Sequence, residues 1–455
     1  MIRCISPIDG SVFAEREALS YEAAQAATER ARAAQSDWAA RPLDDRIALV
    51  RAAVAIIGDM NDRIVPDLAR QMGRPVRYGG EFGGFDERAS YMADIATEAL
   101  ADITIEDSDA FRRVIKRVPH GVVLVVAPWN YPYMTAINTV APALIAGNTV
   151  MLKHASQTPL VGEHLTEAFH AAGIPEDVFQ NVFLDHETTA RLIAAKSFDF
   201  VNFTGSVGGG QAIERAAAGT FTGLGLELGG KDPGYVCDDA DVDAAAETLI
   251  DGAMFNSGQC CCGIERIYVA ERHFDAFVEK AIKIVNGYTL GDPLNAETTI
   301  GPMAHKRFAD EVRAQIAEAI AAGATAHIET FAQDDGGAYL TPQILTDVSH
   351  DMRVMRDESF GPVVGIMPVK DDAQAIELMN DSQFGLTASV WTQDVARAEN
   401  IADQLQTGTV FMNRADYLDP ALCWTGCKDT GRGGGLSVIG YHNLTRPKSY
   451  HLKKG

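Results

Sequence analysis

Three apolar stretches constrain the fold of this chain more than any other feature. The first is an unbroken run over residues 121–127 (Gly-Val-Val-Leu-Val-Val-Ala), the second ends at Lys153, and the third covers residues 198–203. Strands of parallel sheets are covered by helices on both faces, so they carry continuous apolar runs of this kind. Helical spacing of alanines and charges over residues 21–38 and 44–60 supplies such helices. The sequence therefore predicts an α/β fold with parallel sheets.

Each of the three runs ends in residues suited to binding a ligand. Ligands of open α/β sheets lie beyond the carboxyl ends of the strands. The first run continues as Pro128-Trp129-Asn130-Tyr131-Pro132, the second as Lys153-His154-Ala155-Ser156, and the third as Thr204-Gly205-Ser206 and three further glycines. A glycine-rich turn between strand and helix admits a pyrophosphate at the helix N-terminus. On residue type alone, Asn130 between two prolines is more readily interpreted as a turn former, and Lys153 could equally be a surface lysine.

Three adjacent cysteines at 260–262 form the second unusual feature. Neighbouring cysteines do not easily bridge one another, and metal sites usually place two residues between thiolate ligands. The remaining interpretations are a reactive thiol or three small buried hydrophobic residues. Glu227 lies upstream between two leucines, and apolar surroundings raise the pKa of a carboxyl group. A cysteine together with such a base indicates covalent catalysis, although residue types do not separate the three thiols.

The order of these motifs resembles the aldehyde dehydrogenase superfamily from about residue 5 to residue 454. The strings are Glu227 followed by Leu-Gly-Gly-Lys, and Gly258-Gln259-Cys260-Cys261. The resemblance implies that Cys261 is the nucleophile and Glu227 the base. The string at 128–132 resembles the family's Pro-Trp-Asn-Tyr-Pro motif, which implies that Asn130 is an oxyanion-hole residue. Lys153 is expected among the catalytic and the cofactor-binding residues.

The same resemblance implies a nicotinamide cofactor. Gly205 and Ser206 lie in a string similar to the family's cofactor loop, and Trp129 is expected beside them. The string at 357–362 implies that Glu358 holds the nicotinamide ribose and that Phe360 packs near the ring. Ser156 stands where the family usually has a glutamate that binds the adenosine ribose. A carboxylate there repels a 2′-phosphate and a serine does not, so either NAD or NADP is expected.

The fold implied by the resemblance has two Rossmann-like parallel-sheet domains and a β-strand oligomerisation arm. The expected dinucleotide-binding domain covers residues 1–100 and 121–229, the catalytic domain residues 230–430, and the arm residues 101–120 and 431–455. An arm of this kind argues for a homodimer or homotetramer.

The sequence does not identify the aldehyde. The candidate pocket residues are mostly aromatic: Tyr131, Tyr133, Phe255, Cys260, Tyr417 and, beside them, Trp129. As isolated residues, each of these is more often part of a core. Arg414 would suit an anionic aldehyde, whereas Asp416 or Asp419 would suit a cationic one, and the composition of this loop favours neither.

Composition excludes several other functions. The formal net charge of −23 disfavours nucleic acid as a partner, because phosphate binding requires clustered cations. Seven cysteines, three of them contiguous, do not form a disulfide framework, which indicates a reducing cytoplasm. No apolar signal core and no run of about 18 apolar residues is present, so no membrane span is expected. No metal is expected either, since Cys423 and Cys427 have no partner ligands nearby in sequence.

The predicted activity is oxidation of an aldehyde to a carboxylic acid with NAD or NADP, through a cysteine thiohemiacetal and a thioester hydrolysed by water that Glu227 activates. A CoA-acylating semialdehyde dehydrogenase needs no such base, so Glu227 argues against it. A non-catalytic relative would be expected to have lost the nucleophile or the base. An ordinary Rossmann alcohol dehydrogenase gives no reason for Cys261, Glu227 and Asn130 together.

Overall fold

The three apolar runs lie side by side in one six-stranded sheet of the computed structural model, which describes residues 1–454. In spatial order the strands are β19 (Gly431–Arg432), β9 (Gly223–Glu227), β8 (Phe200–Thr204), β5 (Val122–Ala127), β6 (Thr149–His154) and β7 (Phe179–Asn181). The strands from β9 to β7 are parallel, and only β19 is antiparallel to its neighbour. Every residue of β5 and β6 is buried, as the predicted burial on both faces requires.

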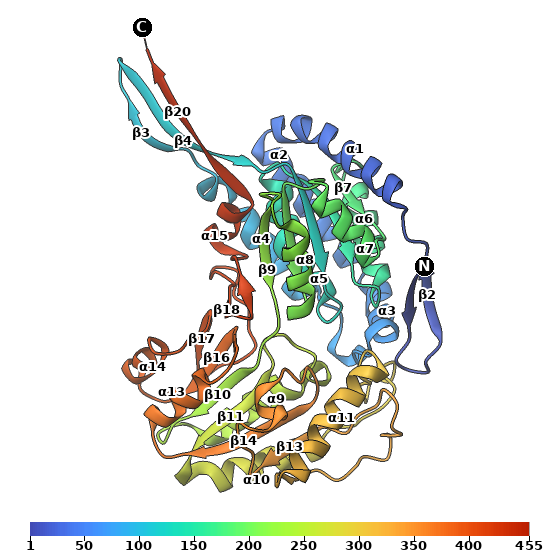
Figure 1. Ribbon diagram of the computed structural model, residues 1–455, viewed down its shortest axis with the longest axis vertical. Helices are drawn as coiled ribbons and strands as arrows, with labels where there is room; N and C mark the ends of the chain where they lie inside the picture. The colour runs from blue at the N-terminus through green and yellow to red at the C-terminus, as the bar shows by residue number, and fades with distance from the viewer. Residues whose placement is uncertain (455) are drawn as a thin grey trace.

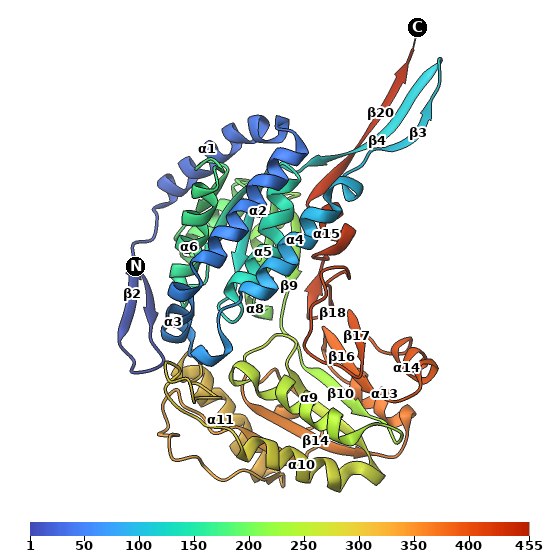
Figure 2. The same cartoon turned by 180° about the vertical axis from the view of Figure 1, so that it is seen from behind.

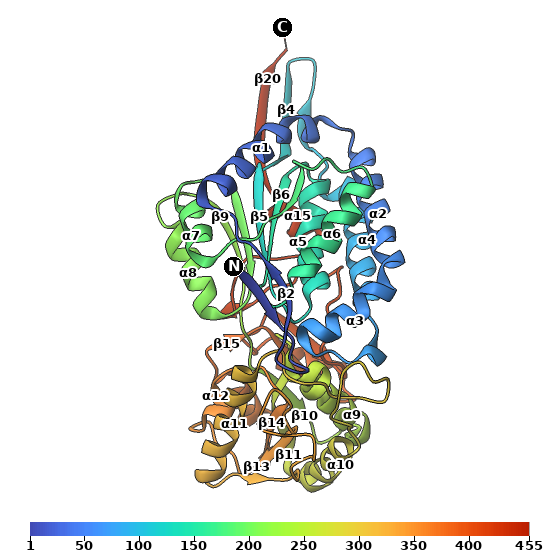
Figure 3. The same cartoon turned by 90° about the vertical axis from the view of Figure 1, so that its right-hand side faces the viewer.

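Helices cover both faces of this sheet (Figure 3). One face packs against α1 (Tyr21–Ala40), α7 (His186–Ala194) and α8 (Val207–Ala217). The other packs against α2 (Leu43–Asp59), α4 (Phe82–Ala99), α5 (Pro132–Ile145) and α6 (Pro159–Ala171). Within β5 the side chains alternate, so that Val122 and Leu124 join the first core and Val123 and Val125 the second. Each such side chain contributes roughly 1.5–3 kcal/mol on burial.

A second, seven-stranded sheet forms the other half of the molecule (Figure 1). Its strands, in spatial order, are β12 (Thr325–Ala326), β13 (Gln343–Thr346), β14 (Val363–Val369), β11 (Ile264–Ala270), β10 (Asp232–Val236), β16 (Thr387–Trp391) and β17 (Thr409–Met412). One face carries α9 (Val242–Met254) and α10 (Phe274–Asn286). The opposite face carries α11 (Lys306–Ala321), α12 (Arg353–Arg356), α13 (Asp372–Asn380) and α14 (Val395–Ala402).

A three-stranded arm projects from the first half, and the chain ends near its tip (Figures 1 and 2). It consists of β3 (Ile103–Asp107), β4 (Phe111–Pro119) and β20 (Thr445–Lys453), with β4 in the middle. The antiparallel β4–β20 register runs without a break from Thr445 opposite Pro119 to Lys453 opposite Phe111.

The expected C-terminal arm segment, 431–455, is too long. Strand β19, at its beginning, pairs with β9 inside the first sheet. Helix α15 (Ser437–Asn443) packs against α4, and the hydroxyl of Tyr441 donates to the Met92 carbonyl at 2.7 Å. Residues 431–444 therefore complete the first domain, and only β20 extends into the arm.

The remaining elements are short connections. They are the hairpin β1 (Ile2–Ile5) and β2 (Val12–Arg16), helix α3 (Asn61–Met72), the pair β15 (Phe384–Gly385) and β18 (Cys427–Lys428), and the 3₁₀ turns η1 (Val76–Tyr78), η2 (Phe255–Gly258) and η3 (Glu271–His273). None of the helices within residues 1–454 is long and apolar enough to cross a membrane.

Two segments lie at the junction of the two halves: the connection from β9 to β10 and the cysteine loop before β11. Strand β9 ends at Glu227 and β10 begins at Asp232, so four residues connect the two sheets. The three cysteines lie between η2 and β11, directly before the second sheet's central strand. The carboxyl ends of the first sheet's strands and the start of β11 therefore meet at the junction of the two halves.

Candidate active site

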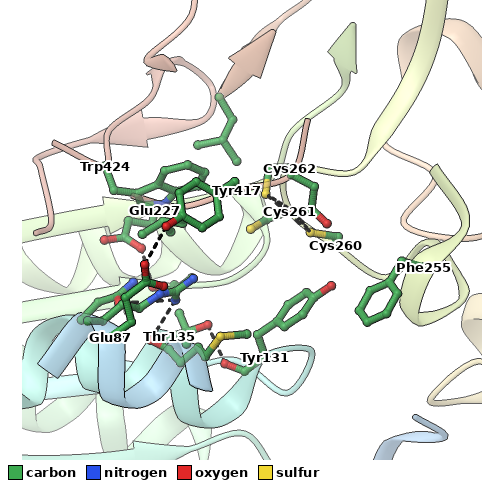
Figure 4. Close-up of a pocket in the computed structure, with 18 of the residues that line it drawn as sticks. Glu87, Tyr131, Thr135, Glu227, Phe255, Cys260, Cys261, Cys262, Tyr417 and Trp424 are labelled. Atoms are coloured by element: carbon green, nitrogen blue, oxygen red, sulfur yellow. Dashed lines mark hydrogen bonds between the residues drawn. The ribbon is translucent and has the colours of Figure 1, made fainter. Parts of the chain in front are cut away.

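A cavity of about 270 Å³ lies at this junction (Figure 4). Six of the predicted site residues line it: Cys261, Glu227, Tyr131, Phe255, Cys260 and Tyr417. These residues come from β9, the start of α5, η2, the cysteine loop and the segment after β17. The fold thus places the candidate nucleophile and the candidate base on one enclosed space.

The segment before the cysteines has unusual backbone geometry. Asn256, Ser257 and Gly258 have φ values of 54°, 56° and 68°. A side chain on Gly258 is excluded, because its Cβ would lie 2.2 Å from the carbonyl oxygen of Gly361. The Ser257 hydroxyl holds the turn by donating to the Gly301 carbonyl at 2.8 Å. Left-handed conformations of non-glycine residues cost of order 1–3 kcal/mol and are typical of functional sites.

Gln259 connects this turn to its surroundings. Its side-chain amide donates to the Asn256 carbonyl at 3.0 Å and accepts from the Ala304 backbone N–H at 2.7 Å. Its own carbonyl accepts from the Asn130 side-chain amide at 3.2 Å. Asn130 is buried next to the cysteine loop, and its amide nitrogen carries a second N–H beyond the one used in this bond.

The three thiols form a cluster in which their sulfur atoms lie within 4.8 Å of one another. Cys260 and Cys262 each donate to the Asp416 carboxyl group, at 3.2 Å and 2.9 Å. The pKa of Cys261 is lowered by hydrogen bonding from Cys260 and then from Cys262, against the opposing effect of burial. The thiolate is the reactive form of cysteine. Three thiols this close also suffice for a metal ion, so the absence of a metal stays a prediction.

Glu227 occupies the last position of β9 and points into the cavity. Burial raises its pKa to about 7, although a hydrogen bond from the Thr204 hydroxyl and the charge of Arg88 act in the opposite direction. The Thr204 bond is 3.2 Å long. A carboxyl group with this pKa is suited to general-base catalysis near neutral pH.

A buried ion pair that the sequence did not reveal fixes the Asn130 loop. Arg74 and Glu81 are 2.6 Å apart, and both side chains are buried. Arg74 also donates to the Asn130 carbonyl and lies 4.7 Å from the centre of the Tyr131 ring. Glu81 accepts from the backbone N–H groups of Tyr133 and Met134, each at 2.9 Å, at the start of α5. The pair has no sequence motif, because its function depends on this tertiary arrangement.

The expected cofactor residues lie along the carboxyl edge of the first sheet and the neighbouring turn at 358–360. The Trp129 ring stacks on Phe308 at 5.3 Å and meets Phe360 edge-on at 5.6 Å. Ser206 caps α8 by accepting from the Gly209 N–H at 3.2 Å, directly after Gly205. Ser156 is exposed in the turn after β6.

Lys153 is the penultimate residue of β6, and both it and His154 are buried. The Lys153 side chain is 8% exposed and makes no hydrogen bond or ion pair within residues 1–454. Burial lowers its pKa, and the charge of Asp185 acts in the opposite direction. An almost buried ammonium group without a partner is costly unless a ligand supplies one.

The glycine pair after Glu227 lets two other segments approach. A Cβ on Gly229 would lie 2.5 Å from a Glu358 carboxyl oxygen, and one on Gly230 would lie 2.3 Å from the Cys261 carbonyl oxygen. The Gly230 N–H donates to Glu358 at 3.0 Å. Burial raises the pKa of Glu358 to about 7. The motif thus brings the expected ribose-binding residue and the cysteine loop against the end of β9.

A second buried ion pair holds the turn at 358–360. Lys231 and Glu265 are 2.5 Å apart, with side chains 0% and 5% exposed. Glu265 accepts from the backbone N–H groups of Ser359 and Phe360, each at 2.8 Å. Lys231 also donates to the Ser359 hydroxyl at 2.9 Å. The only sequence signal for this pair was two charges inside otherwise apolar segments.

Tyr133 and Arg414 lie outside the cavity, contrary to expectation. Tyr133 is 2% exposed, and its hydroxyl lies 2.6 Å from His164. It follows Tyr131 by two positions, and two positions along a helix point to nearly opposite sides. Arg414 is exposed, and its guanidinium lies 3.5 Å from the centre of the Tyr417 ring.

Several cavity residues were missed by the sequence analysis. They are Gly84, Glu87, Arg88, Met134, Thr135, Asn138, Thr204, Leu228, Cys262, Leu386, Asp416, Leu418 and Trp424. Three of these had been considered in other roles: Asp416 as a partner for a cationic aldehyde, Thr204 as the start of the glycine-rich turn, and Cys262 as one of the three thiols. Most of the others lie on α4 and α5, where a lining residue has the same helical spacing as a core residue.

Comparison with known proteins gives consistent results. A sequence model of the aldehyde dehydrogenase family matches residues 1–450. A succinate-semialdehyde dehydrogenase [NADP(+)] of Deinococcus radiodurans is 32% identical over 445 residues, covering 98% of this chain and 93% of that protein. A vanillin dehydrogenase of Corynebacterium glutamicum is 33% identical and covers 94% of this chain and 89% of the relative.

Solved structures show the same similarity. An NAD-dependent aldehyde dehydrogenase from Sinorhizobium meliloti superposes with a TM-score of 0.95 at 32% identity, covering 100% of this chain and 92% of that chain. A succinic semialdehyde dehydrogenase from Streptococcus pyogenes in complex with NADP+ has a TM-score of 0.93 at 28% identity and covers both chains completely.

Proposed function

The chain belongs to the aldehyde dehydrogenase family, and from that premise we propose that Cys261 is the nucleophile and Glu227 the general base of its reaction. The activity that follows from family membership is the oxidation of aldehydes to carboxylic acids with NAD or NADP. One observation carries the assignment of the two residues. Cys261 and Glu227 line the same cavity, and their pKa values are shifted in opposite directions, the thiol downward and the carboxyl group upward to about 7.

The first chemical role falls to Cys261. Its thiolate attacks the aldehyde carbon, and the carbonyl oxygen becomes an oxyanion in the resulting thiohemiacetal. The free N–H of Asn130 and the backbone N–H of Cys261, which makes no hydrogen bond within residues 1–454, are the donors we assign to that oxyanion. The buried Arg74–Glu81 pair holds the Asn130 loop in place for this role.

The residues along the first sheet's edge fit a nicotinamide dinucleotide. Lys153 offers an unpaired ammonium group, α8 presents its N-terminus, and a side chain at Gly208 would meet nothing within 4 Å. We assign ribose and phosphate binding to Lys153, Ser156, Gly205 and Ser206, and the nicotinamide side to Trp129, Glu358 and Phe360. When bound, the cofactor accepts the hydride that leaves the aldehyde carbon.

Glu227 acts after oxidation, when the substrate is a thioester on Cys261. Its ionised carboxylate takes a proton from a water molecule, which attacks the thioester carbon. The carboxylic acid leaves, and the Cys261 thiolate is restored. This role requires a base that is partly ionised at neutral pH, which the burial of Glu227 provides.

We further propose that Ser156 permits NADP as well as NAD. Ser156 is an exposed, uncharged residue at the end of β6, so no carboxylate from this position opposes a 2′-phosphate. Relatives and structural neighbours are named for both cofactors.

The named substrates of the relatives include both succinate semialdehyde and vanillin, so names alone do not select a substrate class.

Trapping the covalent intermediate tests the assignment. Glu227→Gln, incubated with an aldehyde and oxidised cofactor, should accumulate an acyl group on Cys261, located by mass spectrometry of proteolytic peptides. The unmodified chain, treated identically, should carry little acyl group because it hydrolyses the thioester. An acyl group on Cys260 or Cys262 would contradict the choice of nucleophile, and its absence from all three would contradict the role of Glu227.

We also infer that the arm joins copies of this chain into a homodimer or homotetramer. Its outer strands β3 and β20 have free edges, and Ile103, Ile105 and Leu452 on the arm are 55%, 56% and 49% exposed. Unpaired edges with apolar side chains favour association. A chain truncated after residue 444 should lose this association in light scattering.

All seven cysteines are free, which supports a reducing cytoplasm.

A further inference from the structure

Arg88 is the only lysine or arginine that lines the cavity. It lies on α4, and none of its nitrogens is within 4.0 Å of a carboxylate in residues 1–454. Its Nη1 donates to the Met134 carbonyl at 3.2 Å and to the Asn138 side-chain oxygen at 3.4 Å. Its Nε is buried without a hydrogen-bond partner, and no bond is made by Nη2. The guanidinium therefore has unused donors and, within residues 1–454, no carboxylate countercharge in an ion pair with it.

The carboxyl groups around Arg88 do not supply that countercharge. Glu81 is paired with Arg74 at 2.6 Å. Glu87, on the exposed side of α4, accepts from the Tyr417 hydroxyl at 2.6 Å. Asp416 already accepts from the Cys260 and Cys262 thiols, and burial raises its pKa well above the ordinary value. Burial also raises the pKa of Glu227, to about 7. A charge in such surroundings is costly unless it is paired.

Asn138 adds a second unused donor at the same place. It lies on α5, it lines the cavity, and its side-chain oxygen accepts from Arg88. Its amide nitrogen makes no hydrogen bond within residues 1–454. Two N–H donors from neighbouring helices, one of them charged, match the two oxygens of a carboxylate.

We propose that Arg88, assisted by Asn138, binds a carboxylate on the tail of the substrate, so that this chain is selective for short aldehydes with a terminal carboxylate. The proposal rests on the function assigned above, in which the aldehyde end reacts at Cys261. The cavity of about 270 Å³ has room for a short chain, and Met134, Leu386 and Trp424 give it apolar walls for the methylene groups between the two ends. Arg414, which the sequence offered for the same role, stacks on Tyr417 outside the cavity.

The test compares 4-oxobutanoate with its methyl ester, which replaces the negative charge of the tail by a methyl group. We expect the chain to have a higher kcat/KM for the acid. In Arg88→Met the acid-to-ester ratio of kcat/KM should fall by about 10- to 100-fold, the range for a charge-assisted hydrogen bond. Arg88→Lys should keep part of the ratio, because it keeps the charge and loses the two-pronged geometry.

The ratio separates substrate binding from other roles of Arg88. If Arg88 acted only by tuning Glu227, both aldehydes would slow equally and the ratio would stay constant, which would overturn the proposal. Asn138→Asp offers a second variant, in which the new carboxylate pairs with Arg88 and should lower the ratio in the same direction.

Product inhibition of the unchanged chain tests the carboxylate site without any variant. Succinate should inhibit about tenfold more strongly than its dimethyl ester, since only the diacid presents a carboxylate to Arg88. Equal inhibition would overturn the proposal. Turnover of both 4-oxobutanoate and its ester at equal kcat/KM would overturn this proposal alone, whereas turnover of neither would refute the function on which it rests.

Discussion

The pKa of Glu227 leads to a prediction about the pH dependence of turnover. Burial raises this pKa from 4.5 to about 7, which corresponds to roughly 3 kcal/mol of cost for the ionised form. Only the ionised carboxylate activates water, so thioester hydrolysis should rise with pH up to about 7 and level off above it. With a pKa of about 7, about one molecule in a hundred is ionised at pH 5, against about three in four for an unshifted carboxyl group.

Stopped-flow measurement of reduced cofactor between pH 5 and pH 9 separates hydride transfer from hydrolysis. Glu227→Gln should keep the initial burst of reduced cofactor but lose the increase of steady-state turnover between pH 5 and pH 7, which is the rising limb of the pH profile. At pH 8 it should turn over about 10²- to 10⁴-fold more slowly. Thr204→Val removes the 3.2 Å hydrogen bond that holds the pKa down, so its limb should move to higher pH by about one unit. Glu87→Gln, a change to another cavity carboxylate, is the matched control and should keep the limb in place. Loss of the burst in Glu227→Gln, or an unchanged limb in that variant, would refute the reasoning.

Three further changes test other parts of the structure. Cys261→Ala should reduce oxidation by about 10⁴-fold or more while cofactor binding, followed by fluorescence, remains; turnover near that of the unchanged chain would assign the nucleophile to Cys260 or Cys262 instead. Ser156→Glu should shift the ratio of kcat/KM toward NAD over NADP by about tenfold or more, because like charges repel, and an unchanged ratio would place Ser156 away from the adenosine ribose. Lys231→Met should lower the free energy of unfolding by about 3–5 kcal/mol, because Glu265 stays buried without its partner; denaturant titration measures this change, and a loss below about 1 kcal/mol would mean that Glu265 finds another partner or is protonated.

The sequence was informative where local composition determines the outcome. Residues 121–127 are apolar throughout, and they form the fully buried β5 at the centre of the first sheet. The glycines after Glu227 were recognised as a motif, and the structure gives their reason, the close approach of Glu358 and of the Cys261 carbonyl. For residues 121–127 the physical requirement lies within the run itself, whereas the glycines were recognised through the resemblance to a family motif, because the segments that they admit lie far away in sequence.

The sequence failed where contacts connect distant segments. Nothing in residues 260–262 separates the three thiols, since the carboxyl group that engages Cys260 and Cys262 belongs to Asp416, more than 150 positions away. Arg88 resembles any surface arginine of an amphipathic helix until α5 packs beside it. Tyr133 was grouped with Tyr131 because the two are close in sequence, whereas the helix turns them apart.

The pairing of the arm determines when the protein can complete its folding during synthesis. Strand β4 finds its long partner only in β20, which follows the whole second sheet in sequence, and β19 reaches the edge of the base-bearing strand β9 almost as late. While the ribosome makes the second sheet, the edges of β4 and β9 are therefore left without these partners, and such edges are sites of misassociation between nascent chains. Both edges stay uncovered until residues 431–453 have been made, although the strands that they border were synthesised much earlier.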